Sequence, residues 1–541
     1  MERRVWVLFL ITGLLIACVP PVSASAKKAD CSGVQQEVSH EIYQIQGAGT
    51  SSPIEGESVT TCGTVIAISD QGYWMQDTTG DKDASTSEGI FVYHPSADVA
   101  PGQVVKQQGT VKEYYGLTEL SSRSAPDTIG SGSLPDPVEL TASVAYDDLE
   151  TLEGMRVTLK EATVVAGSNQ HGETFVVPGT RTTRVHREDT TTPLLKLDDK
   201  LEKRVTGAST FDRVSGNLTG PLDYAYGAYA LQWNQGSADV ADTGNTENRL
   251  PADDGNLTIT TFNVENYFGV GSEISPGDPD SRVSEEAFKK KTAKLSIVIR
   301  RHLGSPDLLA VQEVEKKEVL EALADRVSAD GGPRYTPYLM EGNDGRGIDV
   351  AYLVKEGIKV RSVEQVGESA TTKVEDCGPL DTDLLFSRPP LVLRVEDSEG
   401  RSISLINNHF KSKGGPDSCR NAQAEFVADV ANREADEGHS IVVLGDLNAF
   451  PDEQAVQMLE SQAKLTNLVD QIPDPRAFSY IYSGKTQFLD HLLVSSDLSP
   501  RTVEVDSAKM NPDFPVSDEQ DDSTALRVSD HDPLRVEFGR K

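Results

Sequence analysis

Residues 441–450 form an apolar run that ends in two polar residues able to do chemistry. The first four residues are apolar and three of them are β-branched, a composition typical of a buried strand. Asp446 and Asn448 follow two positions apart, so their side chains point the same way. A carboxylate there can accept a proton or bind a metal, and a carboxamide can donate to an oxyanion. Asp and Asn also cap the next element, and for this pair alone that interpretation stays open.

The same design recurs at further strand ends in the C-terminal half. Each predicted strand is a short apolar run that ends in a carboxylate, an imidazole or an amide. Their polar residues are Asn263, Glu313, His409, Asp490 with His491, and Asp530 with His531. Capping of the following elements does not explain polar residues at so many strand ends. The pattern therefore predicts one shared cleft at one edge of the sheets.

The acidic and imidazole groups of this predicted cleft suit metal-assisted attack of water on a phosphate ester. Glu313 and Asp530 are hard oxygen ligands for Mg²⁺, Mn²⁺ or Ca²⁺. His531, paired with Asp490, can act as an acid or a base or stabilise developing charge.

The neutral and cationic groups would hold the substrate. The amides of Asn263 and Asn448 can orient phosphate oxygens without adding repulsion. Positive charge for an anionic substrate comes from four residues, Lys411, Lys413, Arg388 and Arg420.

The overall charge runs against a polyanionic partner. The chain has 85 acidic and 51 basic residues and a formal net charge of −34. A protein that handles nucleic acid with this balance must concentrate its cations locally or use a bound metal ion. The acidic surface itself indicates a solvated, soluble protein and says little about function.

The first residues predict export. Arg3 and Arg4 precede an apolar run that ends at Cys18, and small residues follow it, as in a secretory signal peptide spanning residues 1–26. Cleavage after Ala26 gives an extracellular protein. The alternative is a lipid-anchored envelope lipoprotein attached through Cys18. No other segment is long and apolar enough to cross a membrane.

Four cysteines remain after the signal segment, an even number in an exported chain. Their distribution suggests that Cys31 pairs with Cys62 and that Cys377 pairs with Cys419. Free buried thiols are the alternative, because sequence alone does not fix connectivity.

The elements that must position these residues fall into several units, since 541 residues exceed one core. Short alternating strands separated by Gly, Pro and Asp predict a small β-domain over 31–145 and a second, related β-unit over 146–240. One larger β-domain is the alternative. Residues 241–255 read as a linker. Strands mixed with helices then predict an α/β catalytic domain over 256–541.

The C-terminal motifs, in chain order, resemble the endonuclease/exonuclease/phosphatase superfamily. The matching stretches are 262–266, 311–315, 346–351, 408–413, 445–450, 489–492 and 529–533. The resemblance implies a two-sheet, DNase-like α/β sandwich. Together with segments 88–93 and 116–120, the motifs look like bacterial extracellular nucleases that carry an OB-like all-β region before the nuclease domain.

The resemblance also implies roles for the polar residues. Glu313 would bind a divalent cation, with Mg²⁺ expected first and Mn²⁺ or Ca²⁺ as alternatives, and Asn263 and Asp530 would lie nearby. Asp446 would activate water, and Asn448 would hold the phosphate. His531, supported by Asp490, would stabilise charge or donate a proton at the scissile phosphate. His409 would be a second histidine, oriented by Asp349, and His491 would be a supporting residue.

The expected function is therefore a secreted, metal-dependent nuclease, monomeric, acting on DNA, with RNA and the choice of endo or exo action left open. A phosphatase or phospholipid phosphodiesterase on the same fold is one alternative. A non-catalytic, surface DNA-binding protein is the other. Aromatic residues of the β-region, among them Tyr114, Tyr115, Tyr224 and Tyr226, could stack bases, although core or hairpin packing more often explains such residues.

Overall fold

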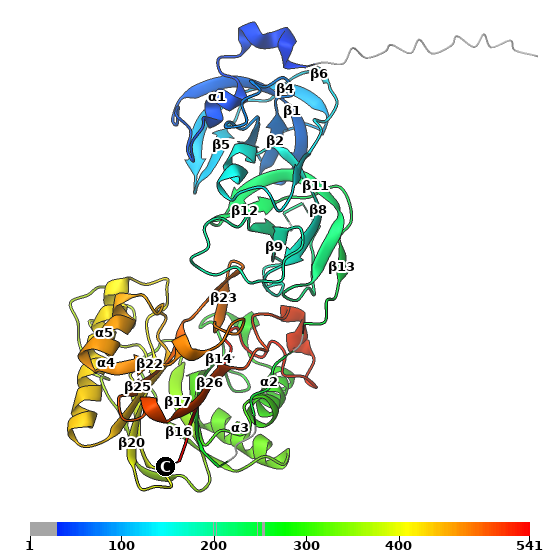
Figure 1. Ribbon diagram of the computed structural model, residues 1–541. Coiled ribbons are helices and arrows are strands. Elements are labelled where there is room, and N and C mark those ends of the chain that lie inside the picture. The colour runs from blue at the N-terminus through cyan, green and yellow to red at the C-terminus, as the bar shows by residue number, and fades with distance from the viewer. Residues whose placement is uncertain (1–29, 199, 202, 246, 252–254, 541) are drawn as a thin grey trace, which may run out of the picture.

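A computed structural model describes residues 30–198, 200–201, 203–245, 247–251 and 255–540. Two small β-barrels precede a larger α/β domain, and the three units follow one another in chain order (Figure 1). The predicted signal segment and Cys18 lie outside the described residues. In the part of the chain that is described, no helix has the length and apolar character needed to cross a membrane.

The first barrel closes on itself through its first strand. Strand β1 pairs with both β2 and β4, which gives the closed order β1-β2-β3-β5-β4-β1, and only β3 and β5 run parallel. Its apolar side chains point inward and form one core. The elements are η1 (Cys31–Glu37), α1 (Ile42–Gln46), β1 (Ser58–Ile68), β2 (Gly72–Gln76), β3 (Gly89–Tyr93), β4 (Gln103–Tyr114), β5 (Leu117–Ser121) and β6 (Asp127–Ser131).

The second barrel repeats this topology. Strand β8 pairs with β9 and β11, the closed order is β8-β9-β10-β12-β11-β8, and only β10 and β12 of the closed ring run parallel. The short strand β7 pairs with β8, so the second barrel begins before residue 146. The elements are β7 (Val138–Leu140), η2 (Asp147–Leu152), β8 (Arg156–Val164), β9 (Thr174–Pro178), β10 (Leu195–Leu197), β11 (Arg213–Ala225), β12 (Ala228–Leu231) and β13 (Asp239–Ala241).

The α/β domain is built on two six-stranded sheets. The first has the order β16-β17-β15-β14-β27-β26, and the second β18-β19-β20-β21-β25-β22. Strands of the first sheet are β14 (Leu257–Tyr267), β15 (Leu308–Val314), β16 (Tyr335–Leu339), β17 (Asp349–Lys355), β26 (Thr502–Ser507) and β27 (Leu534–Phe538). Those of the second are β18 (Lys359–Gln365), β19 (Leu391–Glu396), β20 (Ser402–His409), β21 (Ser440–Asp446), β22 (Leu465–Asn467) and β25 (Asp490–Ser495).

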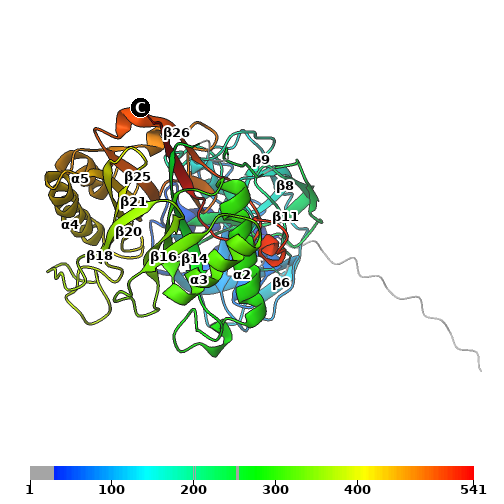
Figure 2. The ribbon, with the colours of Figure 1, turned by 90° about the horizontal axis from the view of Figure 1, so that it is seen from below.

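The sheets pack face to face with helices on both outer faces (Figure 2). One apolar core lies between the sheets, a second beneath α2 and α3, and a third beneath α4 and α5. This confirms the predicted two-sheet α/β sandwich preceded by an all-β region. The helices are α2 (Glu285–Ile297), extended by the π-helix η4 (Val298–His302), α3 (Lys317–Ala329), α4 (Asp417–Asp436), α5 (Gln454–Gln462), η3 (Pro279–Ser281), η5 (Val469–Gln471), η6 (Ser499–Arg501) and η7 (Val516–Gln520).

Both expected cysteine pairs form disulfides. Cys31 is joined to Cys62 beside the first barrel, and Cys377 to Cys419 at the start of α4. Each bond ties a segment with little regular structure to a neighbouring element, and the two pairs are compatible with an extracellular protein.

The second barrel is fastened to the α/β domain by a buried ion pair. Both terminal nitrogens of Arg184 donate to Asp513, at 2.6 and 2.7 Å, and its guanidinium lies over the Phe478 ring. The hairpin of β23 (Tyr480–Tyr482) and β24 (Lys485–Gln487) reaches up to the barrel, where Thr486 forms a bridge with His186 (Figure 1).

Candidate active site

Strand register aligns three of the predicted residues in one row. His409 is the Cα partner of Asp446 between β20 and β21, and Asp446 is the partner of Asp490 between β21 and β25. Gly445 permits this alignment, because a Cβ at that position would lie 2.0 Å from the Asn408 carbonyl oxygen. The sheet edge therefore places an imidazole and two carboxylates side by side.

The buried carboxylate of Asp446 is the centre of the cluster. Its Oδ1 accepts a hydrogen bond from the Asn448 backbone at 2.9 Å, and its Oδ2 accepts one from Asn263 Nδ2 at 3.1 Å. Oδ2 also lies 3.5 Å from His409 Nε2 and 3.9 Å from His531 Nε2. Two imidazoles and an amide thus meet at one carboxylate oxygen.

The imidazole of His531 is held by a second carboxylate. His531 Nδ1 lies 2.7 Å from Asp490 Oδ2, and the Tyr480 ring packs on the imidazole with centroids 4.7 Å apart. The contact through Nδ1 leaves Nε2 directed toward Asp446. Asp490, His531 and Asp446 therefore form a continuous polar chain.

Glu313 reaches the same cleft from the other sheet. The pairing of β14 with β15 shifts register beyond Asn263, and Glu313 adopts φ 64°, so a local irregularity turns its side chain. Its Oε2 accepts from the Asn266 backbone at 2.9 Å, and its Oε1 lies 3.3 Å from Asn263 Nδ2. Asn263 thus joins the two carboxylates, one from each sheet.

Burial and neighbouring charges give Asp446, His531 and His409 different pKa values. Burial raises the pKa of Asp446 to about 7, which the His531 charge partly opposes. Burial works against a charged His531, yet the carboxylates of Asp490, Asp530 and Asp446 raise its pKa well above the ordinary value. Burial, with the Arg388 and His531 charges, keeps the pKa of His409 well below it. At neutral pH His531 is the cation and His409 is neutral.

Asn448 follows Asp446 by two residues and is buried. It adopts φ 47°, and its Nδ2 lies 3.3 Å from the Phe410 carbonyl oxygen. Asp530 follows Ser529, whose hydroxyl donates to the Asn263 carbonyl at 2.7 Å, and its charge raises the pKa of both His531 and Glu265. Both predicted residues therefore border the central cluster.

The two arginines that were predicted to bind substrate donate hydrogen bonds to backbone carbonyls of the loop after β20. Arg388 donates to the carbonyls of His409 and Phe410 and pairs with Asp344. Arg420 donates to the carbonyls of Ser412 and Gly415. Both guanidinium groups are buried, so they shape the loop that follows β20 and offer little surface to a substrate.

The two lysines of that loop differ in their partners. Lys413 pairs with Glu453 at 2.5 Å and lies over the Phe450 ring. For the Lys411 ammonium, no ion pair is found among the described residues, and its side chain packs beside Gly415. Lys411 is therefore the more available cation near the cleft.

Asp349 and His491 contact other groups. Asp349 accepts from the Gly342 backbone at 2.7 Å, and burial raises its pKa to about 7. His409 Nδ1 has no hydrogen-bond partner in the described structure, so Asp349 does not bind it. His491 Nε2 donates to the Ala449 carbonyl at 2.8 Å and fixes the turn after Asn448.

Sequence reasoning missed two supports of the cluster. Tyr480 packs on His531, although no pattern around residue 480 marks it. Asp532 accepts from the backbones of Met510 and Asn511, both at 3.0 Å, and lies 3.4 Å from the Lys509 ammonium. Its adjacency to His531 was the available signal.

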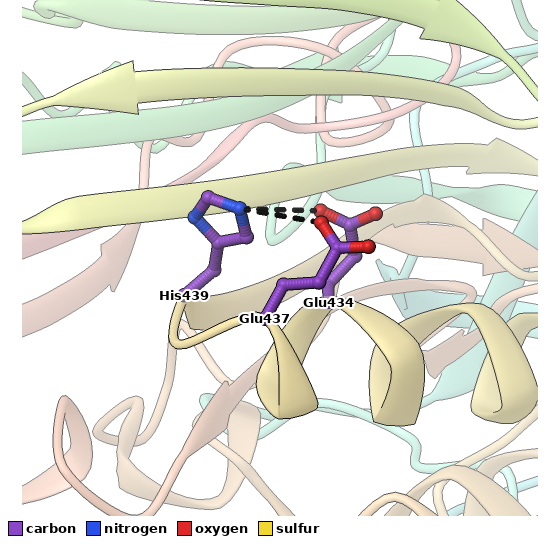
Figure 3. A group of neighbouring side chains, drawn as sticks. All are labelled: Glu434, Glu437 and His439. Atoms are coloured by element: carbon purple, nitrogen blue, oxygen red, sulfur yellow. Dashed lines mark ion pairs between the residues drawn. The ribbon is translucent and has the colours of Figure 1, made fainter.

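A second group of metal-ligand residues, the surface group, lies at the end of α4, where Glu434 is buried, His439 is half-buried and Glu437 is exposed. Glu434, Glu437 and His439 each bring a ligand atom within 4.8 Å of the others, as Asp446, Asp490 and His531 do (Figure 3). Glu434 Oε1 and Oε2 already pair with Arg394, and Oε2 also accepts from Ser404. This surface group therefore has little free ligand capacity.

The family model described as Endonuclease/Exonuclease/phosphatase family matches residues 260–531, and the chain belongs to this family. Its members are hydrolases of phosphodiester bonds and generally use a divalent metal ion, so the chain is a phosphodiesterase-type hydrolase. A model described only as a domain of unknown function matches residues 119–242, across parts of both barrels. The comparison with curated proteins finds no match.

Several solved structures are similar to the α/β domain. The human Nocturnin catalytic domain with bound sulfate has 15% identity and a TM-score of 0.37, covering 52% of this chain and 93% of its own. Truncated TDP2 of Caenorhabditis elegans has 17% identity and a TM-score of 0.37, covering 53% and 98%. An endonuclease/exonuclease/phosphatase from Bacteroides vulgatus has 13% identity and a TM-score of 0.37, covering 53% and 99%.

The donor set in the cleft fits the divalent ion that the family uses. Glu313 and Asp446 present carboxylate oxygens, the hard donors that Mg²⁺ prefers. Among the described residues, Glu313 Oε1 accepts one hydrogen bond, from the Asn263 amide at 3.3 Å, so it retains capacity for a cation. Asp490 Oδ1 is also buried without a hydrogen-bond partner in the described structure.

Proposed function

We propose that the chain is a secreted, divalent-metal-dependent nuclease that hydrolyses phosphodiester bonds of DNA, with RNA as a second substrate class. The observation that carries this proposal is the buried Asp446 carboxylate, shared by two imidazoles and by an amide that also contacts Glu313. Such a cluster holds a base, an acid and metal donors within one cleft.

In this mechanism Asp446 takes the proton from the attacking water. A pKa of about 7, raised by burial, makes it a stronger base than an ordinary carboxylate, and it loses this capacity as pH falls through that value. The oxygen of the water bonds to phosphorus as the bond to the leaving oxygen breaks. The imidazolium of His531, held by Asp490, gives its proton to the leaving oxygen.

The remaining residues hold the phosphate. Asn448 and neutral His409 donate to its non-bridging oxygens without competing for the proton of the water. A divalent ion, held by Glu313 with Asn263 and Asp530, would supply positive charge toward the phosphate. Arg388 and Arg420 keep the neighbouring loop in place.

Features outside the cluster support nucleic acid and export. Lys411 and Lys413 stand on the loop beside the cleft, where a polyanion needs local positive charge. The two disulfides suit an oxidising compartment. We further propose that 31–145 and 146–240 are two OB-like units, because their closed strand orders are identical.

The test is cleavage of defined substrates by the purified protein. Plasmid DNA, single-stranded DNA and RNA are incubated beside nitrophenyl phosphate and sphingomyelin, with Mg²⁺, Mn²⁺ or Ca²⁺ and with EDTA. Metal-dependent cleavage of nucleic acid that EDTA abolishes is the expected result. Turnover confined to nitrophenyl phosphate or sphingomyelin would establish a phosphatase or phospholipase instead, and DNA binding without turnover would establish a surface binding protein.

A further inference from the structure

A large cleft lies where the two barrels meet, apart from the catalytic cluster. Its volume is about 1350 Å³, and its walls come from both barrels. The aromatic hairpins that mark each barrel in the sequence converge on it: the β4–β5 turn with Tyr115 and the β11–β12 turn with Tyr226. The catalytic mechanism uses neither hairpin.

Both hairpin tyrosines occupy backbone positions that tyrosine seldom adopts. Tyr115 has φ 52° and Tyr226 has φ 55°, and each is followed by a glycine that also has positive φ. Two-residue turns of this shape favour Asn-Gly, since a bulky residue is strained there. The presence of tyrosine at a strained position in both barrels points to a use for the side chain.

The tyrosines are also exposed, so core packing does not explain them. The exposed fraction is 84% for Tyr115 and 92% for Tyr226. Tyr224, from the second hairpin, packs against the first, because a Cβ on Gly116 would lie 2.9 Å from its ring. The hairpins therefore form one aromatic rim across the junction of the barrels.

The polar lining of the cleft is predominantly acidic. Asp70, Glu119, Asp198 and Asp223 face Lys112 and Lys200, which gives four carboxylates against two ammonium groups. Lys200 is paired with Asp223 at 3.0 Å and Lys196 with Asp198 at 3.1 Å, which leaves Asp70 and Glu119 against Lys112. The Glu119 carboxylate lines the cleft without a hydrogen-bond partner in the described part of the chain, so it remains an open acceptor.

We propose that this cleft binds a neutral, polyhydroxylated chain, that is, an oligosaccharide. Sugar rings present apolar C–H faces that pack on exposed tyrosine rings, and hydroxyl groups that donate to carboxylates. The excess of carboxylates disfavours a nucleic acid strand, whose phosphates they would repel. The site is independent of the proposed nuclease activity and would attach the enzyme to glycan-coated surfaces.

The experiment titrates the full chain with cellohexaose, chitohexaose and maltohexaose by calorimetry, beside (dT)12 and spermine. Saturable binding of at least one hexasaccharide is expected. Tyr115→Asn and Tyr226→Asn should each weaken it by about ten-fold, the loss of one aromatic contact. Because Asn suits the left-handed conformation, both variants should melt at or above the wild-type temperature, which separates lost binding from lost folding.

Two further variants complete the test. Tyr482→Ala removes an exposed tyrosine outside the cleft and should leave saccharide binding unchanged. Glu119→Gln should weaken saccharide binding and strengthen any binding of (dT)12. The proposal is overturned if none of the three hexasaccharides binds saturably or if both hairpin variants bind as the wild type does. Preferential binding of (dT)12 or spermine at these tyrosines also overturns it.

Discussion

Two clusters in the α/β domain bring a histidine and two carboxylates equally close together, yet only one suits catalysis. In both, three ligand atoms lie within 4.8 Å. Asp446, Asp490 and His531 are buried, and Asp490 Oδ1 has no hydrogen-bond partner in the described structure. At the end of α4, the Glu434 carboxylate already accepts hydrogen bonds from Arg394, and Ser402 Oγ lies 2.7 Å from His439 Nδ1. The Glu437 side chain is 66% exposed.

The difference shows that proximity of residue types does not make a reactive site. Burial raises the pKa of Asp446. Burial opposes the charged form of His531, but the nearby carboxylates, poorly screened by water, raise the pKa of His531 above its ordinary value. At the surface cluster Arg394 and Ser404 lower the pKa of Glu434 despite its burial, so that carboxylate serves as a structural anion. Variants of the two clusters should therefore separate activity from stability.

The largest effect is expected at the central carboxylate. Asp446→Ala removes the base, and turnover of DNA should fall by at least about 10³-fold. Initial rates on plasmid DNA, with thermal melting as the folding check, measure it. The matched change Glu437→Ala in the surface cluster should leave the rate within about two-fold of wild type, as is usual for an exposed side chain. Equal losses in the two variants would remove the distinction between the clusters.

A smaller but more diagnostic effect is expected at Asp490. Asp490→Asn removes the carboxylate that holds the His531 imidazolium, so turnover should drop by about 10²-fold. The pKa of His531 should also fall, because a charge that raises it is gone. The alkaline limb of the kcat profile should then move to lower pH. A pH profile superimposable on that of the wild type contradicts the pairing as a determinant of the acid.

Metal affinity tests the contribution of the other sheet. Glu313→Gln keeps the side-chain shape and removes its charge, so Mn²⁺ binding followed by electron paramagnetic resonance should weaken by at least about ten-fold. Glu437→Gln serves as the control and should bind Mn²⁺ as the wild type does. If the second change weakens binding and the first does not, the cation belongs to the surface cluster.

The smallest effect on activity is expected at Glu434. Glu434→Gln removes the buried one of the two carboxylates that pair with Arg394 and leaves Glu364, so the free energy of unfolding should fall by about 1–3 kcal/mol while kcat is unchanged. Because the folded pKa of Glu434 is lowered, its contribution is present at neutral pH and is lost as pH falls through that pKa. Denaturant unfolding at pH 7 and below measures this. A variant that loses kcat without losing stability would assign Glu434 a catalytic role.

The two-sheet sandwich and most of the cluster could be predicted from the sequence. Each apolar strand that ends in a polar residue indicates that this side chain lies at the edge of a sheet. Asn263, Glu313, His409 and Asp446 meet as that pattern predicts. The arginines show the limit of the method. The sequence shows the charge of Arg388 but not the carbonyls of His409 and Phe410 that its guanidinium binds, so the support it gives to the loop was not predicted.

Long-range packing set the other limits. Tyr480 reaches His531 from a hairpin 51 positions earlier, and only the folded register of β23 and β24 places it there. The second barrel also begins earlier in the chain than the predicted residue 146, because β7 pairs in parallel with β8 across an intervening helix. Neither contact has a local signature that periodicity or composition could reveal.

The buried pair of Arg184 and Asp513 bears on how this enzyme could be dissected. A fragment that begins at residue 256 would keep Asp513 and lose Arg184, leaving a buried carboxylate without its counter-ion. Loss of one partner of a buried pair costs about 3–5 kcal/mol. Phe478 would lose the guanidinium that covers it as well. Asp513→Asn in such a fragment should therefore restore part of its yield.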